Sequence, residues 1–405
     1  MKISILRVLP ILFLVAACTA APSTAQPATV AAESTPVPTV PTTATLTVPP
    51  VTATEAVLPE VTFTKGPYLV PGADAASMNI LWQDTNAANY WLEYGFDTTY
   101  ELGKATLTAV PEDGLAEITL SNLIPDKHYV YRVTDGKSQA AGSFNTSPGN
   151  TSDLTFWVYG DSRNGPQIQD SIDADILAGV QANPAAQSFV LFSGDIMSVA
   201  DEASLQSNQF DAEYPSIREM MRTLPMINAM GNHDGTKLFT KYFPYSIKGH
   251  FYWSFDYGPV HVALVDQYAD VSDGSPQWQW LKEDLTASTK PWKFILLHEP
   301  GWSAGTHPNN EVVQKIIQPI AVQAGVSVIF AGHNHYYARA EVNGVVHITT
   351  GGGGAPLYTP IPGSADVKTV NKAFHYLKVS IVGNTLTATA YTPDDRAIDE
   401  FTVSH

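Results

Sequence analysis

The stretch VSVIFAGHNH, residues 326–335, is an apolar run that ends in two histidines separated by one residue. Four other stretches also run from apolar residues into a polar one, and they read LTFWVYGD (154–161), SFVLFSGD (188–195), PMINAMGNHD (225–234) and WKFILLH (292–298). Segments of helix length separate these runs, and apolar strands that alternate with helices are typical of a sheet buried on both faces. The pattern predicts an α/β domain over residues 150–405.

The polar residues at the ends of these runs form a set of possible metal ligands. They are two carboxylates, an amide and three imidazoles: Asp161, Asp195, Asn232, His298, His333 and His335. In open α/β sheets, ligands bind beyond the carboxyl ends of the strands, so these side chains should converge. A single Gly-Asp or His is more often a turn or a core residue. All of them together predict a site suited to Zn, Mn or Fe rather than to Mg or Ca alone.

The order GD, GD, GNHD, H and GHxH resembles that of the calcineurin-like metallophosphoesterase family. The segments WSFDYGPVHVALVD (253–266) and KGPYL (65–69) make the chain most similar to purple acid phosphatases. The resemblance extends from about Thr62 to Val403. It implies an αββα catalytic domain, in which two central mixed sheets are flanked by helices and a two-metal site lies at their edge.

The resemblance also implies roles for individual residues. Asp195 would bridge two ions of Fe, Mn or Zn, with Asp161 and His335 on the first ion and Asn232, His298 and His333 on the second. A carboxylate that bridges two cations screens their mutual repulsion, and two such ions can clamp a phosphate for in-line attack.

Four further residues are candidates for contact with the substrate or for its support. His233 would face the substrate and stabilise or protonate the leaving oxygen, and Asp234 would orient His233. His307 lies where the family has a substrate-facing imidazole, and a loop position without function is an equal alternative. Arg163 could hold a phosphate oxygen with its planar fork.

Two positions depart from the pattern of the family. Purple acid phosphatases have a metal-binding Tyr where this chain has Ser198, and the wider family often has His where this chain has Arg163. We therefore expect a protein without purple colour, and the occupancy of the first metal position stays open. His261 and His347 alternate with apolar residues and are expected to be structural.

The implied activity is hydrolysis of phosphate esters by attack of a metal-bound hydroxide, without a phosphoenzyme. The first hypothesis is a phosphomonoesterase that acts on a phosphorylated small molecule. A phosphodiesterase or nucleotide pyrophosphatase would have the same motifs. A third possibility is a surface binding protein with a degenerate metal site, although a pure binder has little need for His233.

Short alternating segments over residues 61–149 predict a small antiparallel β-sandwich, because each is bounded by Gly, Pro, Asp or Asn. Leu123, Pro125 and Tyr129 resemble the tyrosine corner of a fibronectin type III domain, with Trp82 as its core tryptophan. We expect this domain to be a folded spacer or a wall beside the substrate.

The first 60 residues differ from the rest of the chain in composition. Lys2 and Arg7, an apolar run and two alanines predict a signal peptide that ends at Cys18, the only cysteine. VAAC resembles a bacterial lipobox, in which the cysteine is acylated; an ordinary signal peptide is the alternative. Residues 19–60 are a Thr/Pro/Ala-rich linker. We expect an exported protein held by lipid at the outer face of a bacterial membrane.

Charge argues against a nucleic-acid partner. The formal net charge of the 405 residues is −17, and Lys and Arg form no cluster. An acidic protein can still bind a small phosphorylated substrate, because bound metal cations supply the local positive charge. The sequence does not determine the oligomeric state.

Overall fold

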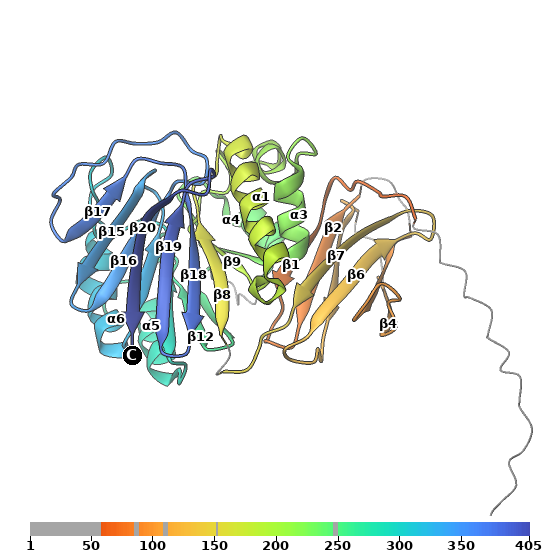
Figure 1. Cartoon of the computed structure of the whole chain (residues 1–405), viewed down its shortest axis with the longest axis horizontal. Coiled ribbons are helices and arrows are strands. Elements are labelled where there is room, and N and C mark those ends of the chain that lie inside the picture. The colour runs from red at the N-terminus through yellow and green to blue at the C-terminus, as the bar shows by residue number, and fades with distance from the viewer. Residues whose placement is uncertain (1–57, 85–88, 108–111, 151–152, 246–249) are drawn as a thin grey trace, which may run out of the picture. The chain divides into compact units, whose positions relative to one another are not determined.

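The computed structural model describes residues 58–84, 89–107, 112–150, 153–245 and 250–405 (Figure 1). The predicted signal peptide and all but the last residues of the predicted linker lie outside the described residues. Among the residues that are described, no helix has the length and hydrophobicity needed to cross a membrane.

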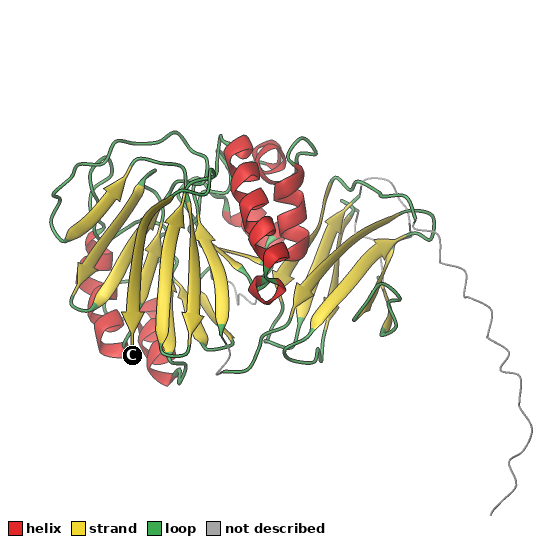
Figure 2. Cartoon of the chain, in the orientation of Figure 1, coloured by secondary structure: helices red, strands yellow, loops and turns green. Residues whose placement is uncertain are grey.

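The N-terminal part of the described chain consists of β-strands in two antiparallel sheets (Figure 2). One sheet has the order β1-β2-β5, with β1 at Lys65–Pro71, β2 at Met78–Gln83 and β5 at Leu115–Leu120. The other has the order β4-β3-β6-β7, with β3 at Trp91–Gly95, β4 at Gly103–Thr106, β6 at His128–Thr134 and β7 at Gln139–Asn145. Side chains from both sheets, such as Trp82 and Phe144, share one core.

Tyr129 has the contacts expected of a residue that fixes the corner between strands. Its hydroxyl accepts a hydrogen bond from the backbone N–H of Ile124 at 2.9 Å. Its ring is buried and stacks on Phe144, with ring centroids 5.4 Å apart. The loop before β6 is therefore held to the core of this region.

Two mixed sheets form the centre of the α/β part, as expected (Figure 1). The six-stranded sheet has the order β10-β9-β8-β18-β19-β20, with bounds Met226–Asn228, Val190–Phe192, Leu154–Tyr159, Tyr376–Val382, Thr385–Tyr391 and Ala397–Ser404. The seven-stranded sheet has the order β11-β12-β13-β14-β16-β15-β17, with bounds Trp253–Tyr257, Val260–Leu264, Trp292–Leu296, Val328–Ala331, Val345–Thr350, Tyr337–Val342 and Val367–Asn371.

Helices accompany both sheets. Their bounds are Pro166–Ala182 (α1), Glu202–Leu205 (α2), Pro215–Thr223 (α3), Thr236–Tyr242 (α4), Pro276–Ala287 (α5) and Gln318–Ala324 (α6). A 3₁₀ turn covers Pro184–Ala186, and π-helical turns cover Gln206–Phe210 and Val313–Ile317. The sheets face each other through aromatic rings: Phe156 on β8 lies 5.5 Å from Phe294 on β13, measured between centroids. β8, β9, β13 and β14 are buried along almost their whole length, whereas β18, β19 and β20 alternate buried residues with partly or fully exposed ones.

A tight hairpin at Gly383-Asn384 joins two strands near the C-terminus. Val382 at the end of β18 pairs with Thr385 at the start of β19, so the loop has two residues. Gly383 has a φ of 56°, in the left-handed region that glycine adopts without a steric cost.

His261 and His347 have structural contacts, as expected. The two ring nitrogens of His261 lie 2.8 Å from carboxylate oxygens of Asp256 and Asp284, which joins β11, β12 and α5. Burial disfavours the imidazolium, but the bonds to the two carboxylates outweigh it and raise the pKa of His261 to about 9. His347 Nε2 lies 2.8 Å from Gln318 Oε1, and burial lowers its pKa to about 3.

Arg218 on α3 joins the N-terminal β region to the α/β part. Its guanidinium donates to the carbonyls of Phe63 at 3.0 Å, Gly66 at 3.2 Å and Phe210 at 2.6 Å. Phe63 and Gly66 belong to the β region, so one side chain satisfies backbone groups on both sides of the contact.

We predict that Arg218→Ala lowers the free energy of unfolding by about 2–3 kcal/mol, because three carbonyls lose a charged donor. Equilibrium denaturation followed by tryptophan fluorescence measures the change. Arg396→Ala is the matched control, because Arg396 is exposed, and it should change stability by less than about 0.5 kcal/mol. Equal losses of stability in both variants would contradict the role of Arg218 in joining the N-terminal β region to the α/β part.

We also predict a pH-dependent contribution from His261. Because its folded pKa lies above the ordinary value of 6.5, its stabilisation is complete below pH 6.5 and is lost as the pH rises through about 9. The stability difference between the wild type and His261→Gln should shrink by about 2 kcal/mol over that range. Denaturation at a series of pH values tests this. His128→Ala removes an exposed imidazole instead, and a similar pH dependence there would show that His261 is not the cause.

Candidate metal centre

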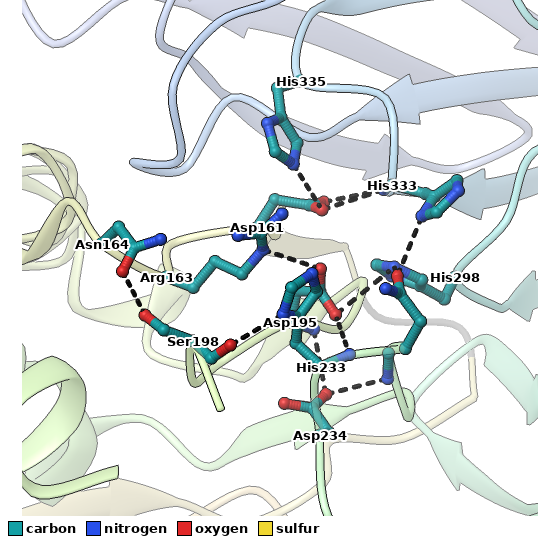
Figure 3. Close-up of polar contacts among 12 residues, drawn as sticks. Asp161, Arg163, Asn164, Asp195, Ser198, His233, Asp234, His298, His333 and His335 are labelled. Carbon is teal, nitrogen blue, oxygen red and sulfur yellow. Dashed lines mark hydrogen bonds and ion pairs between the residues drawn. The ribbon is translucent and has the colours of Figure 1, made fainter. Parts of the chain in front are cut away.

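The structure brings all six predicted ligands together beyond the carboxyl ends of the parallel strands. Figure 3 labels five of them, and the sixth, Asn232, lies within hydrogen-bond distance of His298 and His333. The strands and the residues that follow them are β8 with Asp161, β9 with Asp195, β10 with Asn232, β13 with His298, and β14 with His333 and His335. Five segments that are distant in sequence thus meet at one edge of the two sheets.

A first ligand set consists of Asp161, Asp195 and His335. All three are buried, and one ligand atom from each lies within 4.8 Å of the others. The Nδ1 of His335 lies 2.9 Å from the carbonyl oxygen of Pro356. An N–H at Nδ1 that donates to this carbonyl leaves Nε2 free as a ligand, and Nε2 lies 3.5 Å from Asp161 Oδ1.

A second ligand set consists of Asn232, His298 and His333, with Asp195 shared between the two sets. The Oδ1 of Asn232 lies 3.1 Å from His298 Nε2 and 3.0 Å from His333 Nδ1. The Nε2 of His298 is also 3.5 Å from Asp195 Oδ1. Its Nδ1 lies 2.7 Å from the carbonyl of Ser193, which again leaves the other nitrogen for a metal. Imidazole, carboxylate and amide donors at these positions fit a transition metal ion.

The loops that carry the ligands have unusual backbone conformations. Asp161, Asp195 and His333 have φ values of 58°, 60° and 66°. The left-handed region costs a non-glycine residue roughly 1–3 kcal/mol, so the surroundings must impose it. Gly332 precedes His333, and a Cβ atom there would overlap the Asp161 carboxylate and Ser193. The GH sequence is thus needed for close packing of the loops after β8 and β14.

Carboxylates hold these loops in place by accepting backbone hydrogen bonds. Both oxygens of Asp161 lie 3.0 Å from the N–H of His333. The Oδ1 of Asp195 accepts from the N–H of His233 at 3.0 Å. Burial by itself would raise the pKa of Asp195, but His298 and other donors nearby lower it overall. The backbone hydrogen bonds therefore position both carboxylates.

Asp234 has a different place from the one that the sequence suggested. Its carboxylate accepts from the backbone N–H groups of Asp195 at 2.9 Å, Ile196 at 3.1 Å and Gly231 at 2.8 Å. We expected the Asp234 carboxylate to contact the His233 ring, but the carbonyl of Ser198 holds that ring instead. Burial and the neighbouring Asp195 raise the pKa of Asp234 to about 7. Asp234 is thus a positioning residue for the loop of Asp195.

The ring of His233 is oriented by the backbone of Ser198. Its Nδ1 lies 2.7 Å from the Ser198 carbonyl oxygen, so this nitrogen carries a hydrogen and donates a hydrogen bond to the carbonyl. The Nε2 atom is then the one available to a substrate. To protonate a leaving group from Nε2, the ring must carry a second proton there, with Nδ1–H still on the Ser198 carbonyl.

His307 lies beside the candidate ligands. Its ring centroid is 4.0 Å from that of His333 and 5.6 Å from that of Tyr358. Burial and the nearby His335 lower its pKa. The ring of His307 therefore lies beside the second ligand set, and its catalytic role stays a prediction.

Arg163 and Ser198, the two residues that depart from the pattern of the family, each make a side-chain hydrogen bond. The Nε of Arg163 lies 3.0 Å from Asp195 Oδ2 (Figure 3). This bond occupies one of the donors that the sequence suggested for phosphate. The hydroxyl of Ser198 makes a short hydrogen bond to Asn164 Oδ1.

The aromatic residues beside the ligands in sequence are not the ones whose rings lie beside them in space. Trp302, Tyr336 and Tyr337 follow the ligands closely in sequence, but they are only 8%, 0% and 0% exposed, and their rings pack in the interior. Tyr358 instead stacks on His335, with ring centroids 4.2 Å apart, and Tyr268 is 44% exposed and donates to Glu299. No periodicity marks these loop residues, so the sequence carried no signal for them.

Residues 154–337 match the calcineurin-like phosphoesterase family. Purple acid phosphatase 22 of Arabidopsis thaliana is 34% identical over 25% of this chain and 27% of its own length. Fe(3+)-Zn(2+) purple acid phosphatase 12 of the same plant is 25% identical over 56% of this chain and 57% of its own length.

The chain thus spans between about a quarter and three fifths of the length of these curated relatives. Among solved structures, purple acid phosphatase PPD1 from yellow lupin (Lupinus luteus) seeds has the same fold. Its TM-score is 0.67 at 19% identity, and the match covers 84% of this chain and 74% of the lupin chain. The chain therefore carries a calcineurin-like phosphoesterase domain and is similar to the purple acid phosphatases.

Proposed function

We propose that this protein hydrolyses phosphate esters with two bound transition metal ions and acts as an acid-phosphatase-like phosphomonoesterase. The observation that carries the proposal is the convergence of six metal-ligand side chains at one edge, with the oriented ring of His233 beside them. A relative whose name gives Fe(3+) and Zn(2+) supports a pair of transition metals. The ligand types suit Fe, Mn and Zn, so the identity of each ion is a matter for experiment.

The residues divide the work of hydrolysis by position. Two cations held by the ligand sets would polarise a water molecule and neutralise phosphate charge. As an imidazolium, His233 would keep its Nδ1–H on the Ser198 carbonyl and donate the proton on Nε2 to the leaving oxygen. His307 would contact the substrate from the side of His333. Asp234 would keep Asp195 in its left-handed conformation by binding its N–H.

The proposed substrate is a phosphorylated small molecule. The curated relatives are named as phosphatases, and one from Allium cepa is named phosphoenolpyruvate phosphatase. The exposed Tyr268 ring, near the ligands, offers an apolar surface to the organic part of an ester. We propose monoesters over diesters because the relatives are named as phosphatases. The test below distinguishes the two kinds of ester.

We further propose that the N-terminal β region is a fibronectin type III-like domain. Sheets of three and four strands around one core support this, as does the hydrogen bond between the Tyr129 hydroxyl and Ile124. The burial of Trp82 on β2 in that core also supports it.

Export and lipid anchoring through Cys18 form part of the proposal. Their support is the sequence of residues 1–18, a basic start followed by an apolar run and VAAC. The linker of residues 19–60 would then separate the folded part from the membrane surface.

The proposed activity is tested with 4-nitrophenyl phosphate and bis(4-nitrophenyl) phosphate. The full chain is treated with a chelator and reconstituted with Mn, Zn or Fe. We predict metal-dependent turnover that favours the monoester, and a loss of at least about 100-fold in kcat for Asp195→Asn and for His233→Ala. His128→Ala, in the N-terminal β region, should retain full activity.

Turnover that survives chelation, or that Asp195→Asn leaves unchanged, would contradict the metal-dependent hydrolase. Preference for the diester would replace the phosphomonoesterase by a phosphodiesterase. A folded protein that binds metal but hydrolyses neither ester would favour a binding protein.

Lipid anchoring is tested by Cys18→Ser in a bacterial host. We predict that the wild type partitions into the detergent phase of Triton X-114 and incorporates labelled palmitate, because an acylated cysteine adds long apolar chains. Cys18→Ser should lose the label and enter the aqueous phase. Ala17→Ser is a neighbouring control that leaves the acceptor thiol intact. An unlabelled wild type would contradict the anchor without affecting the proposed hydrolysis.

A further inference from the structure

We propose that the two metal positions are unequal, and that Arg163 makes the first one weak. The ligand set of Asn232, His298, His333 and Asp195 would fill first, and the set of Asp161, Asp195 and His335 would fill only at higher metal concentration. This inference rests on the proposed two-metal function and concerns how this chain's own residues control it.

The two sets differ in the number of side chains that can bind. The second set offers four donors, and the distances of 3.0, 3.1 and 3.5 Å connect them in one group. The first set offers three, Asp161, Asp195 and His335. The only shared ligand is Asp195, so whatever holds its carboxylate affects both positions.

Arg163 holds that carboxylate from the side opposite to the second set. Its Nε lies 3.0 Å from Oδ2 of Asp195, whereas Oδ1 of Asp195 lies 3.5 Å from His298 Nε2. Arg163 is 14% exposed and Asp195 is 1% exposed, so water screens this ion pair little. A guanidinium stays charged at every accessible pH. A cation in the first set must therefore share the Asp195 carboxylate with a permanent positive charge.

The hydroxyl that could complete the first set is turned away from it. Ser198 Oγ is bonded to Asn164 Oδ1, and the N–H of Ser198 donates to Ser204 Oγ at 2.8 Å. The N–H of Asn164 donates to Asn208 Oδ1 at 2.9 Å. Ser198 and Asn164 are thus both held by hydrogen bonds that do not involve the metal ligands.

The backbone keeps Arg163 in position. Its N–H donates to the carbonyl oxygen of Asp195 at 3.3 Å, in addition to the side-chain bond. The same loop also carries Asp161, whose N–H donates to the carbonyl of Gly194 at 2.9 Å. Arg163 is therefore attached to Asp195 at two points. In a protein with one bound ion, its guanidinium supplies the positive charge beside Asp195 that a second ion would otherwise supply.

The test uses the metal-free full chain and Mn²⁺ as the probe. Calorimetric titration should show one tight ion and a second whose dissociation constant is at least about 10-fold larger. Electron paramagnetic resonance should show the signal of an isolated ion through the first equivalent and a coupled pair only with excess Mn²⁺. Both readouts are independent of catalysis.

Substitutions then assign each ion to its ligand set. Arg163→Gln removes the charge and keeps hydrogen-bonding capacity, and it should reduce the difference between the two affinities. Arg163→His adds an imidazole and should reduce it further. His335→Ala should abolish only the weak ion, and His333→Ala should weaken the tight one. Circular dichroism confirms that each variant is folded.

Two outcomes would overturn the inference. One is a pair of equal affinities in the wild type, and the other is a difference that Arg163→Gln leaves unchanged. The absence of any bound Mn²⁺ in a folded wild type, also with Zn²⁺ or Fe, would instead contradict the proposed two-metal enzyme. Failure of the inference is therefore distinguishable from failure of the proposed function.

Discussion

The candidate centre depends on carboxylates, buried or partly buried, that accept hydrogen bonds from the backbone of neighbouring loops. Asp161 binds the N–H of His333, Asp195 binds that of His233, and Asp234 binds that of Asp195. Each bond joins loops that follow different strands. A buried carboxylate is costly without such donors, and the strained loop conformations are costly without such acceptors. Ligand placement and loop conformation therefore stabilise each other, and neither is explained by the strands alone.

This constraint also explains why glycine precedes the ligands. Asp195 and His333 follow Gly194 and Gly332, at points where backbone and side chains of neighbouring loops come into contact. A Cβ at Gly194 would approach His298 Nδ1 to 2.6 Å. The GD and GH motifs are thus a packing requirement as much as a chemical one. The apolar strands fix the position at which each loop begins. The carboxylates then fix the path of the loop through their hydrogen bonds to backbone N–H groups.

The sequence predicted those features that depend on local pattern. Apolar runs located the strands, and the polar residues at their ends located the six ligands. The sequence pattern did not predict β4 as a strand, because its sequence, GKAT, has no apolar alternation. The partners of Asp234, the bond between Arg163 and Asp195, and the burial of Tyr336 were not predictable in this way. They depend on how loops from different strands meet, and no periodicity encodes that.

The N-terminal β region has contacts that a simple spacer would not need. Tyr68 on β1 donates to the carbonyl of Tyr242 at 2.8 Å, and Lys65 lies 3.4 Å from Glu202. Glu202 also accepts from the Tyr242 hydroxyl at 2.7 and 2.8 Å. Glu202 follows the Asp195 loop and Tyr242 ends α4, the helix after the GNHD motif. The β region thus contacts both segments that lead away from the ligands. Because those segments begin at the metal centre, a change in this contact would reach His233 through the chain itself.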